Sequence, residues 1–256
     1  MQRVDAPEIL DSDACSPCEA QAVLTVLDRI NRWFGGVSTT QKMVERAVQG
    51  MAAKRFSLLE VAAGSGRGAE LVRQRLAQRG ISLDVTLLDV ACSHLPGENS
   101  AAANQCVVAD ALALPFADGS FDVVSCNLFA HHLQPQQLKQ FAQEALRVSR
   151  RAVLINDLVR HPLHLALAYI GYPIMRNRVA WLDGLTSVRR AYVPMEVQSM
   201  LAGLSSVGMP PLLEISRHYL FRMGVIIWKS PIKERTIYLT NDQHFADIVP
   251  GKKKLD

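Results

Sequence analysis

The sequence lacks a basic stripe, a long apolar run and a dense set of cysteines, and each absence excludes a class of protein. Aromatic residues make up 6% of the 256 residues, and no Lys or Arg cluster is interleaved with them. Nucleic acid is therefore not an expected partner. The net charge of +4 is compatible with an anionic substrate. The longest apolar stretch, PLHLALAYIGYPIM, is too short and too interrupted to span a bilayer.

The five cysteines are too scattered to predict a disulfide framework. They stand at positions 15, 18, 92, 106 and 126, and three of them lie in apolar stretches. An odd count in this pattern indicates reduced thiols in a cytoplasmic protein. The polar start, MQRVDAPEILDSD, is not a secretory signal. The CSPC pair has no second CxxC and no nearby His pair, so we interpret it as two free thiols in a flexible N-terminal segment and expect no metal site.

The chain begins with helical patterns. Apolar residues recur with the helical period from Glu19 to Phe34, and Gly35 and Gly36 end that pattern. A second helix is predicted in TTQKMVERAVQGM. These two segments predict an N-terminal helical cap over residues 1–54.

From residue 55 onward, short apolar strands alternate with helices. This alternation predicts one α/β domain over 55–230, with a parallel sheet buried on both faces. Residues 161–205 are expected to insert as a lid over an apolar acceptor pocket, and 231–256 form a polar tail. The last two strands are joined by only a few residues, so they form an antiparallel hairpin. The predicted strands are 57–62, 84–89, 105–110, 121–126, 151–157, 212–217 and 221–229.

Polar residues and glycines follow the first three strands. Glu60 and the turn Gly64–Gly68 follow the first strand, Asp89 ends the second and Asp110 ends the third. The carboxyl ends of parallel strands meet at one edge, where ligands of open α/β sheets bind. An acidic strand end also caps helices or forms turns. Taken together, the three ends predict a pocket for an adenosine-bearing ligand.

The order LLEVAAGSGRG, LLDVACSHL and ADALALPFADGSFDVVSCNLFAHHL resembles the class I S-adenosylmethionine-dependent methyltransferases. It is most similar to the branch that includes ubiquinone- and menaquinone-pathway C-methyltransferases. The resemblance covers roughly residues 55–160. It implies a Rossmann-like, mostly parallel seven-stranded sheet whose last strand is antiparallel, with helices on both faces and S-adenosylmethionine as cofactor.

The resemblance assigns the cofactor contacts. Ala62, Gly64 and Gly66 would hold the methionine part, Asp89 the ribose, and Asp110 with Ala111 the adenine. The family often has Gly where Ala62 stands, so we expect shifted contacts rather than lost binding. The full set of expected cofactor residues is Arg32, Trp33, Glu60, Ala62, Gly64, Ser65, Gly66, Asp89, Val90, Asp110, Ala111 and Asn127.

Segments outside the core are similar to methyltransferases of bacterial polyketide and phenolic-lipid pathways, which belong to secondary metabolism. That similarity implies O-methylation of a phenolic acceptor. A phenol needs a base to remove its proton, and histidine suits this role. His132 is the first candidate base and His131 the second, each with a structural or pocket-lining role as the alternative. The candidate acceptor residues are Asp157, Arg160, His161, Arg190 and Tyr192.

Three other functions stay open. The first is C-methylation of a quinone precursor. The second is an NAD(P)-binding oxidoreductase, since Gly64-x-Gly66-x-x-Ala69 also fits the dinucleotide fingerprint. Against it, more than fifty residues precede the turn and no Tyr-x-x-x-Lys pair exists. The third is a non-catalytic adenosine-binding scaffold. The sequence does not identify the acceptor or the oligomeric state.

Overall fold

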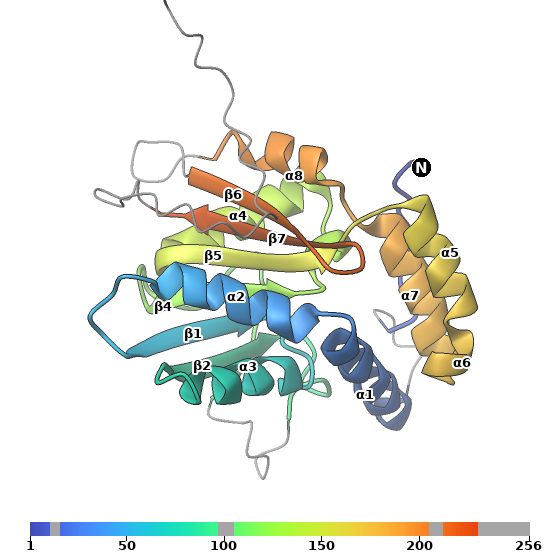
Figure 1. The fold of residues 1–256 in the computed structure, drawn as a ribbon, viewed down its shortest axis with the longest axis horizontal. Coiled ribbons are helices and arrows are strands. Elements are labelled where there is room, and N and C mark those ends of the chain that lie inside the picture. Colours follow the sequence, from blue (N-terminus) through green and yellow to red (C-terminus); the bar gives the residue numbers. More distant parts are fainter. Residues whose placement is uncertain (11–15, 97–104, 205–211, 230–256) are drawn as a thin grey trace, which may run out of the picture.

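A seven-stranded sheet runs through the molecule, and every expected strand is present (Figure 1). The computed structural model describes residues 1–10, 16–96, 105–204 and 212–229. The spatial order is β3-β2-β1-β4-β5-β7-β6. The bounds are Arg55–Val61 (β1), Ser82–Asp89 (β2), Cys106–Val108 (β3), Phe121–Asn127 (β4), Ser149–Leu158 (β5), Leu212–His218 (β6) and Arg222–Trp228 (β7).

Only one strand runs against the others within this sheet. β1 to β5 pair in parallel, whereas β7 is antiparallel to both β5 and β6. The short connection between β6 and β7 forces this reversal, because a parallel crossover needs a dozen or more residues. The predicted fold class, with its antiparallel C-terminal strand, is confirmed.

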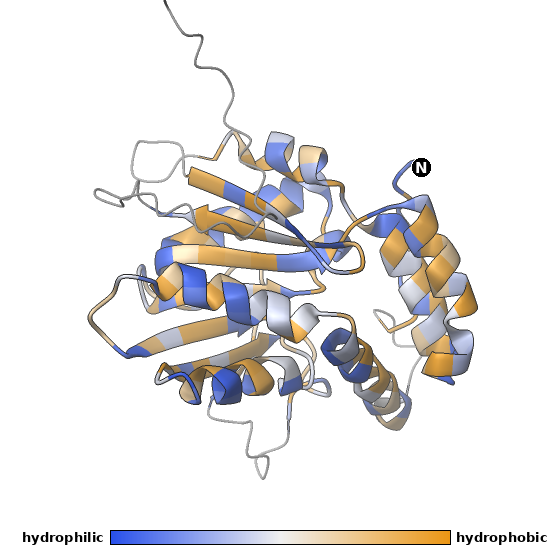
Figure 2. Ribbon diagram, viewed as in Figure 1, coloured by the Kyte–Doolittle hydropathy of each residue, from blue (hydrophilic) through white to orange (hydrophobic). Residues whose placement is uncertain are grey.

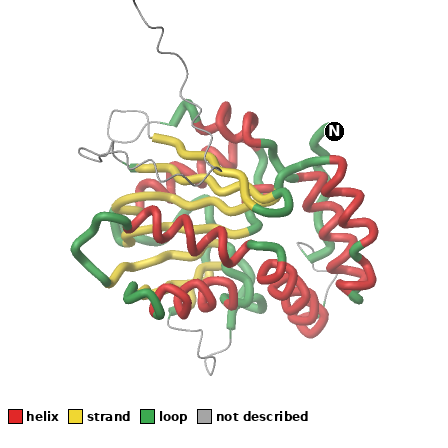
Figure 3. Tube along the Cα trace, viewed as in Figure 1, coloured by secondary structure: helices red, strands yellow, loops and turns green. Residues whose placement is uncertain are grey.

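Helices cover both faces of the sheet, as the ribbon and the tube show (Figures 1 and 3). The helices α2 (Gly36–Val48) and α3 (Arg67–Ala77) pack on one face, with Met43, Val44 and Leu76 buried. On the other face lie α4 (Pro135–Val148) and α8 (Pro194–Leu201), with Phe141 and Leu201 buried. Burial of both faces explains the continuous apolar strands.

The remaining helices stand at the carboxyl edge of the parallel strands (Figure 1). They are α1 (Pro17–Trp33), α5 (Pro162–Ile170), α6 (Tyr172–Met175), α7 (Arg178–Arg190) and the 3₁₀ turn η1 (Ala130–His132). Thus α1 lies beside that edge, whereas α2 belongs to the helical layer of the sheet. Likewise α5 to α7 lie at the edge, and α8 joins the layer on the α4 face.

Residues 1–10 are packed, in contrast to the loose segment that composition predicts. They run beside α7, where Asp183 accepts from the amides of Ile9 (2.7 Å) and Leu10 (3.0 Å). Glu8 is buried. The first helix then begins in a capping box of Ser16 and Glu19. Cys18 is an exposed thiol in α1, while Cys15 and the predicted tail 231–256 lie outside the described residues.

A buried polar chain joins the α1–α2 corner to the sheet. The fully buried Arg222 of β7 donates to Asn31 Oδ1 (2.8 Å), Asn156 Oδ1 (3.2 Å) and the Phe34 carbonyl (2.9 Å). Burial lowers the pKa of Arg222 to about 10. The Asn31 carboxamide occupies the space that a side chain on Gly36 would need. Glycine is therefore required at position 36 by this close approach.

We expect Gly36→Ala to destabilise the protein by about 2 kcal/mol, because its methyl group displaces Asn31 and weakens the buried hydrogen bond to Arg222. Urea unfolding measures the change. Gly203→Ala is the matched control, since its added carbon meets the Lys139 Nζ at an ordinary 3.6 Å. Equal stability of the two variants would contradict the packing argument.

Candidate functional site

The turn after β1 takes the left-handed backbone that glycine favours. Gly64 and Gly66 have φ of 52° and 69°, and a side chain on Gly66 would overlap Leu87 of β2. Ala62 is also left-handed, with φ of 54°. An L-residue there costs roughly 1–2 kcal/mol relative to its usual conformation. The backbone at position 62 therefore has a conformation that glycine adopts at less cost than alanine.

Helix α1 lies over this turn. Ser65 Oγ donates to Asp28 of α1 (2.5 Å), and Leu24 lies 3.4 Å from where a Gly64 side chain would start. Burial raises the pKa of Asp28, opposed by Ser65 and Arg67. The contacts over the turn come from these α1 residues, whereas Trp33 is 57% exposed with the Arg29 guanidinium over its ring, and Arg32 is exposed. The covering role of Arg32 and Trp33 stays a prediction.

Asp89 faces the glycine turn, as a ribose-binding carboxylate must. Its Oδ2 accepts from the Gly64 amide (2.9 Å), its Oδ1 accepts from Ala91 (3.1 Å), and His94 lies 3.5 Å away. Burial raises the pKa of Asp89, but His94 and the two amides outweigh it and leave the pKa lowered. A carboxylate accepts about four hydrogen bonds, so the ionised group keeps capacity for hydroxyl groups of a ligand.

The ends of β2 and β3 meet as expected. Asp89 pairs with Val108, which brings Asp110 to the same edge two residues later. Asp110 is exposed and caps its own turn by accepting from the Leu112 amide (2.8 Å), and Ala111 is buried. Val90 is 74% exposed. The exposed Val90, which follows Asp89 directly, offers apolar surface at the edge where the adenine ring is predicted to lie.

Three buried side-chain oxygens of β1 and β4 lack hydrogen-bond partners among the described residues: Glu60 Oε2, Ser125 Oγ and Asn127 Oδ1. The Ser125 hydroxyl can also donate, whereas Asn127 Oδ1 and an ionised Glu60 only accept. The Asn127 Nδ2 donates to Thr40 Oγ1 (2.8 Å) and lies 3.5 Å from Glu60 Oε1. A buried acceptor without a hydrogen bond destabilises the folded state, because it has lost its hydrogen bonds to water. An ammonium group donates and never accepts, so the α-ammonium of S-adenosylmethionine fits this pair.

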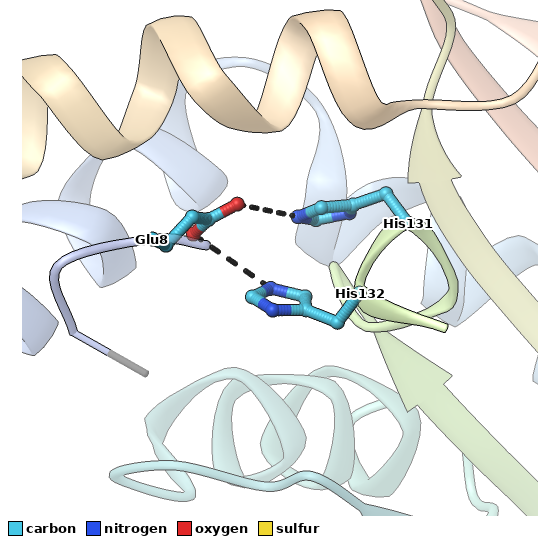
Figure 4. Close-up of side chains that lie close together, drawn as sticks. All are labelled: Glu8, His131 and His132. Carbon is cyan, nitrogen blue, oxygen red and sulfur yellow. Dashed lines mark ion pairs between the residues drawn. The ribbon is translucent and has the colours of Figure 1, made fainter. Parts of the chain in front are cut away.

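The candidate histidines lie in η1, directly after β4 (Figure 4). Asp157, at the end of β5, accepts from the His131 amide (2.8 Å) and contacts His131 Nδ1 (2.7 Å). Glu8 lies on the other side, 3.4 Å from His131 Nε2 and 3.7 Å from His132 Nε2. Burial lowers the pKa of His131, but Asp157 and Glu8 raise it to about 10. His132 is the more exposed of the two histidines, at 22% of its side chain.

The other residues predicted to bind the acceptor form hydrogen bonds or ion pairs within the protein. Arg190 is buried and donates to the His132 carbonyl (2.8 Å), and Tyr192 donates to the Leu133 carbonyl (2.7 Å). Arg160 pairs with Glu196 (2.5 Å), and His161 accepts from the Leu163 amide (3.1 Å) at the start of α5. Asp157 likewise interacts with the amide and the ring of His131. Their predicted contact with an acceptor stays a prediction.

Sequence reasoning missed the part of the site that the N-terminus supplies. Arg3 donates to the carbonyls of His131 and Leu133 (3.1 Å each) and lies over the Tyr192 ring. Glu8 completes the histidine pair. No local pattern marks either residue, because their partners are more than 120 positions away in the chain.

Burial raises the pKa of Glu60 to about 7, against the effects of Ser125 and Asn127. The folded state thus holds the proton more tightly than the unfolded state, so stability is full below pH 4.5 and falls as the pH rises to about 7. We expect Glu60→Gln to gain about 3 kcal/mol of unfolding free energy relative to the natural chain across this window, at roughly 1.4 kcal/mol per pKa unit. Denaturant unfolding of both proteins at stepped pH measures the difference, and a pH-independent difference would contradict it.

A family model described as methyltransferase domain matches residues 59–155. No curated protein matches the chain. The matched range begins in the strand that carries Glu60 and ends in β5, so it contains the glycine turn, Asp89, Asp110 and the histidine pair.

Solved structures share the fold at low identity. An O-methyltransferase family 2 protein from Planctomyces limnophilus, in complex with apigenin, is 16% identical over 86% of this chain and 64% of its own (TM-score 0.54). The citrinin polyketide synthase CMeT domain is 12% identical over 77% and 52% (0.53). The plantazolicin methyltransferase BpumL, in complex with a triazolic desmethylPZN analog and SAH, is 12% identical over 87% and 94% (0.61).

The chain spans less than two thirds of the length of the first two of these structures. Residues 59–155 thus match a methyltransferase-domain model, and the strand order and the left-handed glycine turn agree with the Rossmann-like methyltransferase fold.

Proposed function

We propose that the chain methylates the hydroxyl oxygen of a phenolic or polyketide-derived small molecule. The observation that carries this proposal is the position of His132: it follows β4, next to the strand that leads into the glycine turn, and part of its ring is exposed. An imidazole at that place is suited to take the proton of a phenol beside the cofactor.

When bound, S-adenosylmethionine would supply a methyl carbon on its sulfonium; the phenol oxygen bonds to that carbon in line, the carbon–sulfur bond breaks, and S-adenosylhomocysteine leaves. The chain's contribution is alignment, worth up to ~7–11 kcal/mol in ideal geometry. Asp89 would hold the ribose hydroxyls, and Glu60 with Asn127 the ammonium group. His132 Nε2 would hold the phenol proton as the oxygen attacks. His131, fixed by Asp157 and Glu8, would keep η1 and so His132 in place.

The segment over the carboxyl edge favours an apolar acceptor. Helix α5 is largely apolar on its outer side (Figure 2), and its Leu163 and Ile170 are 54% and 73% exposed. Between α6 and α7, Tyr172, Arg178 and Trp181 line a hollow of about 330 Å³. Together with α1, these helices are suited to exclude water from the reacting atoms. No helix in the described residues is long and apolar enough to cross a membrane.

C-methylation of a quinone precursor is the second candidate, favoured by the likeness to a polyketide synthase CMeT domain. Removal of a phenol proton activates a ring carbon as well as the oxygen, so the same histidine serves both. A ring-deuterated phenol separates the two: O-methylation keeps every deuterium, and C-methylation loses one. Mass spectrometry of the product after incubation with S-adenosylmethionine reads both outcomes.

We expect Asp89→Asn to weaken S-adenosylmethionine binding roughly tenfold or more, because a hydrogen bond to a charged group contributes ~1.5–3 kcal/mol. Isothermal titration measures the affinity. Asp84→Asn is the matched control on the same strand, since Asp84 is exposed and pairs only with Arg55 among the interactions of the described residues. Equal loss in both variants would remove Asp89 from the cofactor site.

We expect His132→Gln to lower kcat with a simple phenol by about 10²–10⁴-fold. The deficit shrinks with a nitrophenol, which is much more acidic than phenol and is already ionised in part at neutral pH. His218→Gln on β6 is the control and keeps its activity. If the deficit is the same for both phenols, His132 is not the group that accepts the proton.

A further inference from the structure

Three potential metal ligands from distant parts of the chain converge on one point (Figure 4). Glu8 comes from the N-terminal segment, and His131 and His132 come from η1. One ligand atom of each lies within 4.8 Å of the others. We propose that Glu8, His131 and His132 bind one first-row divalent metal ion of the Zn²⁺ or Co²⁺ class. No metal site was expected from the sequence. The site proposed here uses none of the residues predicted to bind the cofactor.

The spacing fits such an ion. Ligand atoms that each lie ~2.0–2.1 Å from a tetrahedral zinc are ~3.3–3.4 Å apart. Glu8 Oε1 lies 3.4 Å from His131 Nε2, and Glu8 Oε2 lies 3.7 Å from His132 Nε2. The two imidazole rings are 4.3 Å apart, tilted by 38°. The three ligand atoms lie within 4.8 Å of one another, so the partly exposed His132 ring has to move closer to complete the ligand set.

His131 has the outer contact that metal-binding histidines require. Its Nδ1 lies 2.7 Å from Asp157 Oδ1, so its Nε2 is the nitrogen turned toward Glu8. That Nε2 is buried and has no hydrogen-bond partner among the described residues. A carboxylate on the far nitrogen fixes the ring and raises the basicity of the ligating one. The arrangement is that of a carboxylate–histidine–metal triad.

Glu8 is held in place by α7. Asp183 accepts from the two amides that follow Glu8, and Ser187 Oγ donates to Glu8 Oε1 (2.8 Å). Ser187 in turn also donates to the Asp183 carbonyl (2.8 Å). The carboxylate is thus preformed, although it belongs to a segment without secondary structure.

A metal ion bound here would replace the proton that His131 carries between two carboxylates. Two buried carboxylates, Glu8 and Asp157, flank the single ring of His131. The neighbouring guanidinium groups of Arg3 and Arg190 donate to main-chain carbonyls of η1. Two imidazoles and one carboxylate are the donor set of His₂Glu zinc sites, which keep a fourth position for water or substrate. Of the three proposed ligands, only His132 has a side chain that is more than a tenth exposed, so the fourth position would open on the side of His132.

The role of the ion, unlike its binding, rests on the proposed function. With the ion bound, His132 Nε2 is a ligand and no longer the base; a phenol oxygen in the fourth position would instead lose its proton to water more readily, since a bound metal stabilises the oxyanion. The binding experiment contains neither cofactor nor acceptor, so failure of metal binding and failure of methyl transfer are separate results.

The test is titration of the full, chelator-treated chain with Co²⁺, read by visible absorption, and with Zn²⁺, read by mass spectrometry of the dialysed protein. A Cys15→Ser, Cys18→Ser background removes the CSPC thiols as competing ligands. We expect one equivalent of metal in this background, with a tetrahedral Co²⁺ spectrum that lacks a thiolate charge-transfer band.

Variants assign the ligands. Glu8→Gln and His132→Gln are expected to weaken binding at least 100-fold, and Asp157→Asn by about 10–100-fold, as outer-shell changes do. Glu196→Gln and His218→Gln are matched controls and keep full affinity. His132→Gln alters a partly exposed side chain, so it gives an answer even where a buried variant does not fold. Binding below a tenth of an equivalent, or binding that survives His132→Gln, would overturn the proposal.

Discussion

The contact between Asp157 and His131 is the constraint from which the candidate site is built. A carboxylate buried at the end of β5 is unfavourable unless hydrogen bonds and a positive charge compensate for the lost water. The ring and the main-chain amide of His131 both supply that compensation. The result is that η1 is fastened to β5 rather than only to β4, which it follows. Other contacts then form around η1: Arg190 and Arg3 bind its carbonyls, and Glu8 faces its rings.

A second buried polar chain decides where α1 lies. Thr40 of α2 accepts from Asn127 of β4 and from Asn156 of β5, and Asn156 accepts from Arg222, which reaches Asn31 of α1. Because these groups satisfy one another in a water-free interior, the α1–α2 corner has one position relative to the sheet. That position brings Asp28 and Leu24 over the glycine turn. In this structure α1 is therefore held over the turn by the hydrogen bond from Ser65 to Asp28.

Much of the fold follows from local sequence patterns. Each strand is a short apolar run, and the brief link before β7 dictates its direction. Strand ends predict Asp89 and Glu60 because the parallel arrangement brings carboxyl ends to one edge. The helical period also predicts α1 and α2. It does not show whether such a helix caps the carboxyl edge of the sheet or packs against one of its faces. Helix α2 buries Met43 and Val44 against the sheet, and nothing in its own pattern distinguishes that partner from another helix.

The site resists prediction wherever a residue acts through a distant partner. Glu8 lies in a polar segment that composition describes as loose, and its burial depends on Asp183 and Ser187 of α7. In the sequence Asp28 is one of several polar residues on an amphipathic helix, and only the fold shows that Ser65 donates a hydrogen bond to it. Ala62 is a different case, since the resemblance leads one to expect glycine there, and only the backbone angle shows that the alanine is left-handed.

His131 and His132 have identical side chains but different surroundings. They are adjacent in a 3₁₀ turn, where successive side chains point about 120° apart. His131 therefore turns inward between Asp157 and Glu8, whereas His132 reaches Glu8 from the exposed side. An inward imidazole flanked by two carboxylates is held in one orientation, which suits a fixed ligand or support. The outer imidazole is partly exposed, and for that reason the pair divides into one buried histidine that anchors η1 and one whose ring is accessible from outside.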